Sequence, residues 1–155
     1  MSVTTSARSP DQDCHRHGWE ADQRRPQRRD RNSDAGLRRA VRLGEAWHPL
    51  RFTMPWLRKA VDRMTALADE QRRPVPGLAP RIALRLAGSP VTDPGRLAGE
   101  GTIDQVLDDL AELSLLGAGT VVLDPFNGDP GETHHPEVAW QALATVSAGT
   151  RHLGE

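Results

Sequence analysis

A polar cap, an amphipathic helix and a glycine stop follow one another in the stretch NSDAGLRRAVRLG, which starts at Asn32. The side-chain oxygens of Asn32 and Ser33 can accept hydrogen bonds from the first free N–H groups of a helix, so the stretch predicts a helix start. Gly44 predicts the helix end. Residues 47–49, Trp-His-Pro, predict a short extended segment, because proline biases the residue before it away from helix.

Helix and strand patterns alternate through the middle of the chain. Thr53 can cap a helix that runs to Arg72, since apolar residues recur there at helical spacing. Residues 73–77, with two prolines and a glycine, predict a connection. Residues 81–87 alternate apolar with smaller or charged side chains, as a strand does. A long loop over 88–101 follows, and loops of this length are either functional or loose.

The final third predicts two helices around a strand. Thr102 and Gln105 form a capping box, and Gly117 closes the helix that they start. Residues 120–125 predict a strand buried on both faces, as parallel strands are when helices cover them. The last helix starts near Pro136 and is expected to direct five side chains toward a core: Val138, Ala139, Ala142, Leu143 and Val146. Three acidic residues are expected to form a solvated helix face: Asp108, Asp109 and Glu112.

This order of elements predicts an α/β fold with parallel strands joined by right-handed crossovers. The three strands that it contains make a small sheet. At 155 residues the chain is too short for a whole (β/α)8 barrel, which takes about 250 residues.

Residues 1–31 differ in composition from the rest of the chain. Between Thr4 and Arg31 there is no Leu, Ile, Val, Phe or Met, whereas arginine recurs. Such a segment cannot bury enough surface to offset its ordering entropy, so we expect a disordered, non-native leader. An arginine-rich arm that binds nucleic-acid phosphates is the alternative. The net charge of −1 argues against attraction of the whole molecule to nucleic acid.

The cysteine count and the hydropathy pattern bear on location. Cys14 is the only cysteine, so an internal disulfide is impossible and a reducing, cytoplasmic setting is expected. No run approaches the ~18 apolar residues of a membrane span, and the first residues lack the apolar region of a signal peptide. We therefore expect a soluble protein without a membrane partner.

Two stretches of the chain resemble a known protein family. The helix between Ser33 and Gly44, followed by Trp-His-Pro, is similar to the second half of the luciferase-like monooxygenases. The run TIDQVLDDLAELSLLGAGTVVLDP, residues 102–125, looks like the last helix–strand pair of that family. Together the resemblance covers about two thirds of the chain. It implies a partial (β/α)8 TIM barrel, made of the helix after the fifth strand and the last three parallel βα units.

The resemblance divides the chain into three parts. Residues 32–149 would be the C-terminal part of a luciferase-like barrel, preceded by the leader over 1–31 and followed by a frayed tail over 150–155. In the family, a buried strand ending in Gly-Gly precedes the first helix, whereas this chain has Asp30 and Arg31 there. This abrupt loss beside an intact helix suggests a frameshift or a wrongly chosen start.

The resemblance also implies a cofactor. The family's oxidoreductases use FMN or the deazaflavin coenzyme F-420, and the intact enzymes act on paired donors with incorporation or reduction of molecular oxygen. The phosphate end of the cofactor would lie at a helix start, where unpaired N–H groups favour anions. The matching residues are Asn32, Ser33 and Asp34, which alternatively only cap the helix. With much of the pocket missing, we expect little or no activity from this chain alone, and no catalytic residue is assigned.

Other readings of single residues stay open. His48 follows a predicted strand and is either a packed structural histidine or a proton-transfer residue. Neither Cys14-His15-Arg16-His17 nor Asp129 with His134-His135 has the spacing of an established metal site, so no metal is expected. A second function of another class is a non-catalytic α/β module, whose exposed sheet edge pairs with a partner or forms a homo-oligomer.

Overall fold

The computed structural model describes residues 33–126 and 131–150. In these residues helices alternate with short parallel strands, which confirms the expected α/β class. The expected leader over 1–31, the residue Asn32 and residues 151–155 of the expected tail lie outside the described residues.

The helices lie close to their predicted bounds. The described α-helices are α2 (Asp34–Leu43), α3 (Met54–Gln71), α4 (Ile103–Leu115) and α5 (Pro136–Thr150), with a short 3-10 helix, η2 (Glu132–His134). The strands are β1 (Ala46–Trp47), β2 (Gly77–Leu78), β3 (Arg81–Ala83), β4 (Arg85–Leu86), β5 (Glu100–Gly101) and β6 (Val122–Asp124).

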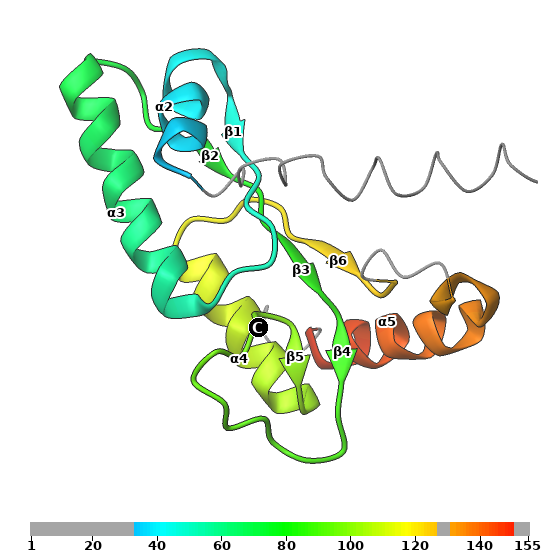
Figure 1. Cartoon of the computed structure of the whole chain (residues 1–155). Helices are drawn as coiled ribbons and strands as arrows, with labels where there is room; N and C mark the ends of the chain where they lie inside the picture. The colour runs from blue at the N-terminus through cyan, green and yellow to red at the C-terminus, as the bar shows by residue number, and fades with distance from the viewer. Residues whose placement is uncertain (1–32, 127–130, 151–155) are drawn as a thin grey trace, which may run out of the picture. The chain divides into compact units, whose positions relative to one another are not determined.

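Every strand pair in the described residues is parallel: β1 with β2, β3 with β6, and β4 with β5. Two further parallel bridges, from Leu50 to Arg81 and from Leu78 to Ala118, continue these pairings along the same backbone. Strand β1, the run from β2 through β4, and β6 therefore lie side by side, with the run from β2 through β4 in the middle (Figure 1).

The helix starts follow the predicted caps. Thr53 Oγ1 accepts a hydrogen bond from Trp56 N at the start of α3. At the start of α4 both bonds of the capping box between Thr102 and Gln105 are present. The end of α3 is fixed by Arg72, whose φ of 52° places it in the left-handed region.

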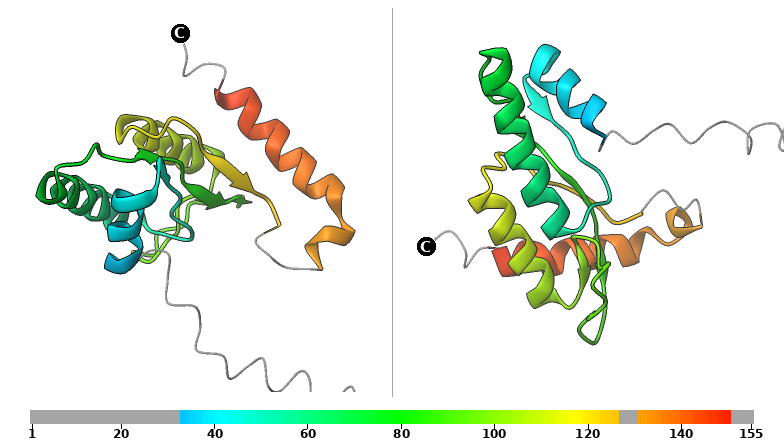
Figure 2. Two further views of the ribbon diagram at one scale, coloured as in Figure 1. Left: turned by 90° about the horizontal axis from the view of Figure 1, so that it is seen from above. Right: turned by 60° about the vertical axis from the view of Figure 1, so that its left-hand side comes forward.

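Two apolar clusters hold the helices on the strands. The larger one joins α2 and α3 to the strands and includes the fully buried Leu57 and Ile82. The smaller one joins Leu84 to Val106 of α4 and Val146 of α5. In both views of Figure 2, α2 and α3 lie together at one end of the strands and α5 lies at the other end.

The predicted strand over 81–87 differs from the structure in its bounds. Pairing begins at Gly77, inside the predicted connection, and it is interrupted at Leu84 between β3 and β4. The interruption has a topological reason, because β3 pairs with β6 whereas β4 pairs with β5. Leu84 N still donates to Asp124 O, and Arg85 N donates to Gly99 O, so pairing with β6 ends on one edge as pairing with β5 begins on the opposite edge.

The loop over 88–101 ends in a strand that the sequence did not predict. Arg85 N donates to Gly99 O at 2.9 Å, and Ala87 N donates to Gly101 O at 2.7 Å. Gly99 has a φ of +90°, and a Cβ there would lie 2.3 Å from Ala83 O. Only glycine lets the two backbones approach this closely.

Two burial predictions near the end of the chain are wrong. The strand expected over 120–125 is not buried on both faces, since Val122 is 40% exposed on β6, which pairs only with β3 in the described residues. Val138 is 64% exposed, because α5 turns Ala139 and Val146 inward instead. Thr150, the first residue of the expected tail, belongs to α5. No helix in the described ranges is long and apolar enough to cross a membrane.

Candidate functional site

The start of α2 carries two of the three residues predicted to contact a cofactor phosphate. Ser33 Oγ accepts a hydrogen bond from Gly36 N at 3.3 Å, and Ser33 O accepts one from Leu37 N at 3.0 Å. The bond from Leu37 is the first ordinary helical bond, so the Ser33 side chain occupies one of the N–H groups that a helix start leaves free, that of Gly36. Asn32, the third predicted residue, lies outside the described part of the chain.

The charges around this helix start are mixed. The exposed carboxylate of Asp34 lies 3.6 Å from Nη2 of Arg38 and 3.6 Å from Nε of Arg63. A phosphate here would meet the helix dipole and two guanidinium groups, but also a carboxylate in the first turn. The residues present fit a phosphate poorly, and the contacts of Ser33 are those of a helix cap.

His48 lies directly after β1 and is half-buried. Its Nδ1 is hydrogen-bonded to the backbone carbonyl of Ala79 on the neighbouring segment. This contact ties two adjacent strands together, which supports the structural interpretation of this histidine. The preceding Trp47 is 4% exposed and packs against Trp56, with ring centroids 6.1 Å apart, so it belongs to the core.

Metal-ligand side chains do not gather in the described ranges. No group of three or more His, Cys, Asp or Glu there could hold a metal ion. His135 Nδ1 lies 3.3 Å from Glu137 Oε1, and both side chains are exposed. The other residues of the two groups considered from the sequence, Cys14 to His17 and Asp129, lie outside the described residues.

An ion pair crosses from β3 to β6. Arg81 donates to Asp124 Oδ2 from Nη2 at 2.6 Å and from Nε at 3.1 Å. Arg81 is in register with Val122, and Asp124 with Ala83, so the two charged residues are diagonal neighbours on one face of the strands. Asp124 is the better shielded partner, with its side chain 15% exposed against 45% for Arg81.

A hollow of about 640 Å³ lies where β4 and β6 end. Its lining is mainly apolar and includes Leu86, Phe126 and Val138, while Arg85 and His135 add nitrogen atoms. The carboxyl ends of parallel strands are the edge at which α/β proteins bind ligands. This arrangement suits a ligand with an apolar body and an anionic group. The residues that line this hollow come from separate elements, so no local sequence motif predicted it.

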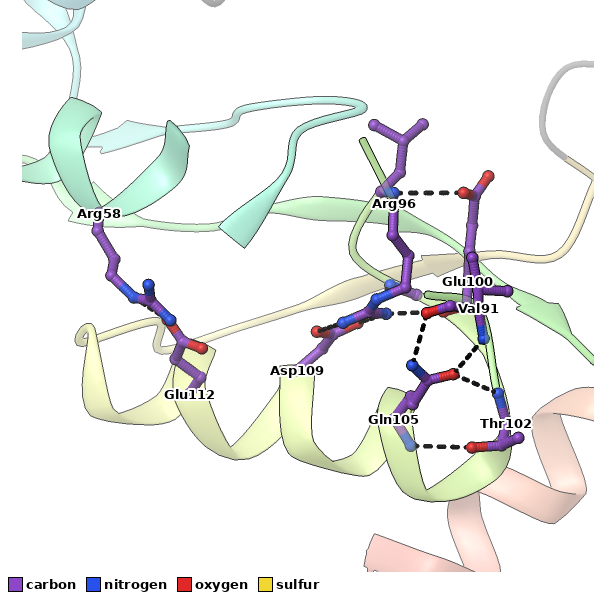
Figure 3. A network of polar contacts seen from close by, with 10 residues as sticks. Arg58, Val91, Arg96, Glu100, Thr102, Gln105, Asp109 and Glu112 are labelled. Carbon is purple, nitrogen blue, oxygen red and sulfur yellow. Dashed lines mark hydrogen bonds and ion pairs between the residues drawn. The ribbon is translucent and has the colours of Figure 1, made fainter. Parts of the chain in front are cut away.

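A buried ion pair fastens the long loop after β4 to α4 (Figure 3). Arg96 donates to the carboxylate of Asp109 at 2.8 and 2.6 Å and to Glu100 O at 2.7 Å. Asp109 also accepts from Gly99 N at 2.9 Å. We refer to these four residues as the Arg96 clasp. The hydrogen bonds to Asp109 raise the pKa of Arg96 above its ordinary value, so Arg96 keeps its charge.

The expectation that Asp109 lies on a solvated helix face is wrong. Asp109 is 2% exposed, because it shares a face of α4 with the buried Val106 and Leu113. Helical spacing from these two apolar residues was the available signal, since positions three and four apart lie on one face. Glu112 is partly shielded by its ion pair with Arg58.

A second fastening holds the start of the same loop. Gln105 Oε1 accepts from Val91 N at 3.0 Å and from Thr102 N at 3.2 Å. Its Nε2 donates to Val91 O at 3.0 Å. One side chain therefore closes the capping box and also binds the loop backbone (Figure 3).

A second hollow, of about 360 Å³, lies between α2 and β1. Its lining includes Arg39, Ala40 and Leu43 from the helix and Trp47 and His48 from the strand segment. Trp47 Nε1 is buried and has no hydrogen-bond partner among the described residues. A buried donor without an acceptor costs about 1 to 3 kcal/mol, so it calls for an explanation.

Comparisons of the chain with protein-family models, with curated proteins and with solved structures gave no match.

Proposed function

We propose that residues 32–149 are the closing part of a luciferase-like (β/α)8 barrel, from an oxidoreductase of the monooxygenase type, and that this chain alone has little or no activity. The observation that carries the proposal is the strand order. Strand β1, the run from β2 through β4, and β6 lie side by side and parallel in chain order, and the helices α3 and α4 connect them. This is the connectivity of a barrel arc.

The hollow at the ends of β4 and β6 supports the same proposal. It lies on the edge where barrel enzymes bind their substrates, and Arg85 and His135 stand over an apolar lining. In the intact family, FMN or the deazaflavin coenzyme supplies the hydride or oxygen chemistry when bound. The residues of this chain would shield one side of that reaction from water and orient an anionic group.

The proposed cofactor contact at Asn32, Ser33 and Asp34 explains why activity should be low. The Ser33 side chain occupies the N–H group of Gly36 for its own cap, and Asp34 places a carboxylate beside the proposed phosphate. A phosphate held firmly at this helix start would need further residues from the missing barrel strands.

Cofactor titration tests the activity part of the proposal. We expect FMN or the deazaflavin coenzyme, added to the purified full chain, to give no saturable fluorescence change and no turnover. Cofactor-dependent turnover by this chain alone would refute the expected inactivity.

The DNA just upstream, translated in the other two reading frames, tests the origin of the chain. We expect it to encode an apolar strand ending in Gly-Gly, and the absence of such a strand would count against the barrel assignment.

The second candidate function is a non-catalytic α/β module that binds a partner or a second copy. The observation that favours it is the outer edge of β1, which in the described residues pairs only with β2 and borders a hollow. Light scattering separates the barrel fragment from a module that binds a second copy. A defined oligomer supports that module, whereas an isolated barrel fragment should be monomeric or aggregating; a module that binds a different partner is tested by adding that partner.

A further inference from the structure

We infer that the hollow between α2 and β1 is a slot for one extended, apolar β-strand supplied by another polypeptide. The slot is defined by Arg39, Ala40 and Leu43 of α2 and by Ala46, Trp47 and His48 of the strand segment. The inference rests on the second candidate function, the partner-binding module, and names the kind of partner. It does not depend on any cofactor.

The backbone of β1 provides the first argument. Glu45 O and Trp47 O accept hydrogen bonds from Gly77 N and Ala79 N, so the carbonyls of these two residues face β2. In a parallel strand the residues between them direct their N–H and C=O groups to the opposite edge. Ala46 therefore presents its backbone to the slot, where an added strand can pair with it.

The side chains that line the slot indicate which kind of strand would fit it. Leu43 is 71% exposed at the end of α2, although it borders a concave surface, and Ala40 and Trp47 continue the apolar lining. A strand with aliphatic side chains on one face would cover these groups. Arg39 is the charged side chain of the helix wall, and an acidic residue on the incoming strand would neutralise it.

Trp47 provides a reporter for the slot. It is one of the lining residues, and its buried indole Nε1 lacks a hydrogen-bond partner among the described residues. The signal of this indole N–H should therefore change when an added strand occupies the slot.

Residues 4–31 are a poor source of such a strand. The residues that lead into α2 are the natural source, because a strand before a helix enters a βα unit from that side. From Thr4 to Arg31, however, the sequence has no Leu, Ile, Val, Phe or Met and is rich in arginine. A segment of this composition does not match an apolar slot, which argues against residues 4–31 as the occupant.

A designed peptide tests the inference on the full chain. The probe is a synthetic peptide of about ten residues, the length of a long strand, that alternates valine and threonine between terminal glutamates. We expect it to shift the backbone amide signals of Ala46 and His48 and the indole signal of Trp47 in a saturable way in two-dimensional NMR spectra. The same peptide, methylated on the backbone nitrogens of one edge, should not bind. Equal binding of both peptides, or binding of neither, overturns the inference.

A pair of matched variants locates the binding. Leu43 and Leu115 are the last residues of α2 and α4, and they are 71% and 88% exposed. Leu43→Glu should weaken peptide binding by about tenfold or more, whereas Leu115→Glu should leave it unchanged. Circular dichroism checks that both variants stay folded. Equal effects of the two substitutions, or peptide-induced shifts confined to Val121 and Leu123 of the other edge, overturn the inference.

Light scattering tests whether a second copy of the chain occupies the slot instead of a strand from a different polypeptide. If the chain without peptide forms a dimer that Leu43→Glu dissociates, a second copy fills the slot and the inference is overturned. If the peptide fails to bind but Leu43→Glu still forms a defined oligomer, the inference about the slot is overturned, whereas the second candidate function, a partner-binding module, is retained.

Discussion

Arg96 binds both carboxylate oxygens of Asp109, at 2.8 and 2.6 Å, and so joins the loop after β4 to a helix that follows it in the chain. The carboxylate is nearly fully buried, and Gly99 N provides a third hydrogen bond. Bidentate, charge-assisted pairs of this kind fix geometry as well as adding energy. The clasp therefore explains why a Gly- and Pro-containing loop ends in the ordered strand β5.

Arg96→Ala should be strongly destabilising, because it leaves a buried carboxylate without its counter-ion. Removing one partner of a buried ion pair costs about 3 to 5 kcal/mol. Arg96→Lys keeps the charge but loses the two-pronged geometry of the guanidinium group, so its unfolding free energy should lie between those of Arg96→Ala and the parent chain. Urea unfolding followed by circular dichroism measures both, with the exposed Arg39→Ala as control. A loss from Arg96→Ala no larger than that of the control would contradict the role assigned to the clasp.

The Arg96 clasp should contribute equally across the neutral pH range. The pKa of Arg96 is raised in the folded chain by its hydrogen bonds to Asp109. A raised folded pKa means that the stabilisation is fully present below the unfolded pKa and is lost only as the pH rises through the folded pKa. Both lie far above neutrality for arginine. The difference in unfolding free energy between the parent chain and Arg96→Ala should therefore not fall between about pH 7 and about pH 9.

Gly99→Ala should loosen the contact between β4 and β5. A Cβ at this position would lie 2.3 Å from Ala83 O, and the φ of +90° is rarely adopted by residues with a side chain. We expect a loss of about 2 kcal/mol or more in unfolding free energy. Gly88→Ala is the matched control, since nothing lies within 4 Å of a Cβ there. Faster amide exchange at Arg85, whose N–H donates to Gly99 O, should accompany the loss. Equal stability of the two variants would contradict the close-approach argument.

The parts of this fold that could be predicted from the sequence are those that depend on neighbouring residues. The helix caps at Ser33, Thr53 and Thr102 were predicted and are present, because a cap needs only a side chain and an N–H group three positions away. The parallel arrangement also followed from the alternation of helices and strands.

The parts that could not be predicted depend on contacts across the chain. Arg96 and Asp109 belong to a loop and a helix, and neither residue by itself indicates the other. The hollow with Arg85 and His135 forms only when the ends of β4 and β6 come together. Val122 reads as a buried strand residue, yet it is exposed because β6 has no second neighbour in the described residues. Local pattern carries no information about which neighbour a strand lacks.

Thr102→Ala should destabilise α4 by about 1 kcal/mol, the usual value of a lost helix cap. Gln105→Ala should cost more, because Gln105 also binds both backbone groups of Val91. The double variant should lose less than the sum of the single losses, since both residues share the capping box. Thermal and urea unfolding of the three variants provide the measurement. Strictly additive losses in unfolding free energy would show that the Thr102 cap and the Gln105 contact with the loop stabilise the chain independently.

Arg58→Ala should have no measurable effect on stability, although Arg58 also pairs with a carboxylate of α4. Its partner is Glu112, and the two side chains are 53% and 28% exposed, in contrast to the buried Asp109. The hydrogen bond to Glu112 raises the pKa of Arg58, so Arg58 keeps its charge, yet water and salt screen this exposed pair. We expect the same unfolding midpoint for Arg58→Ala and the parent chain, at low and at high salt. A loss comparable to that of Arg96→Ala would mean that the number of ion pairs on α4, and not their burial, determines how firmly the helix is held.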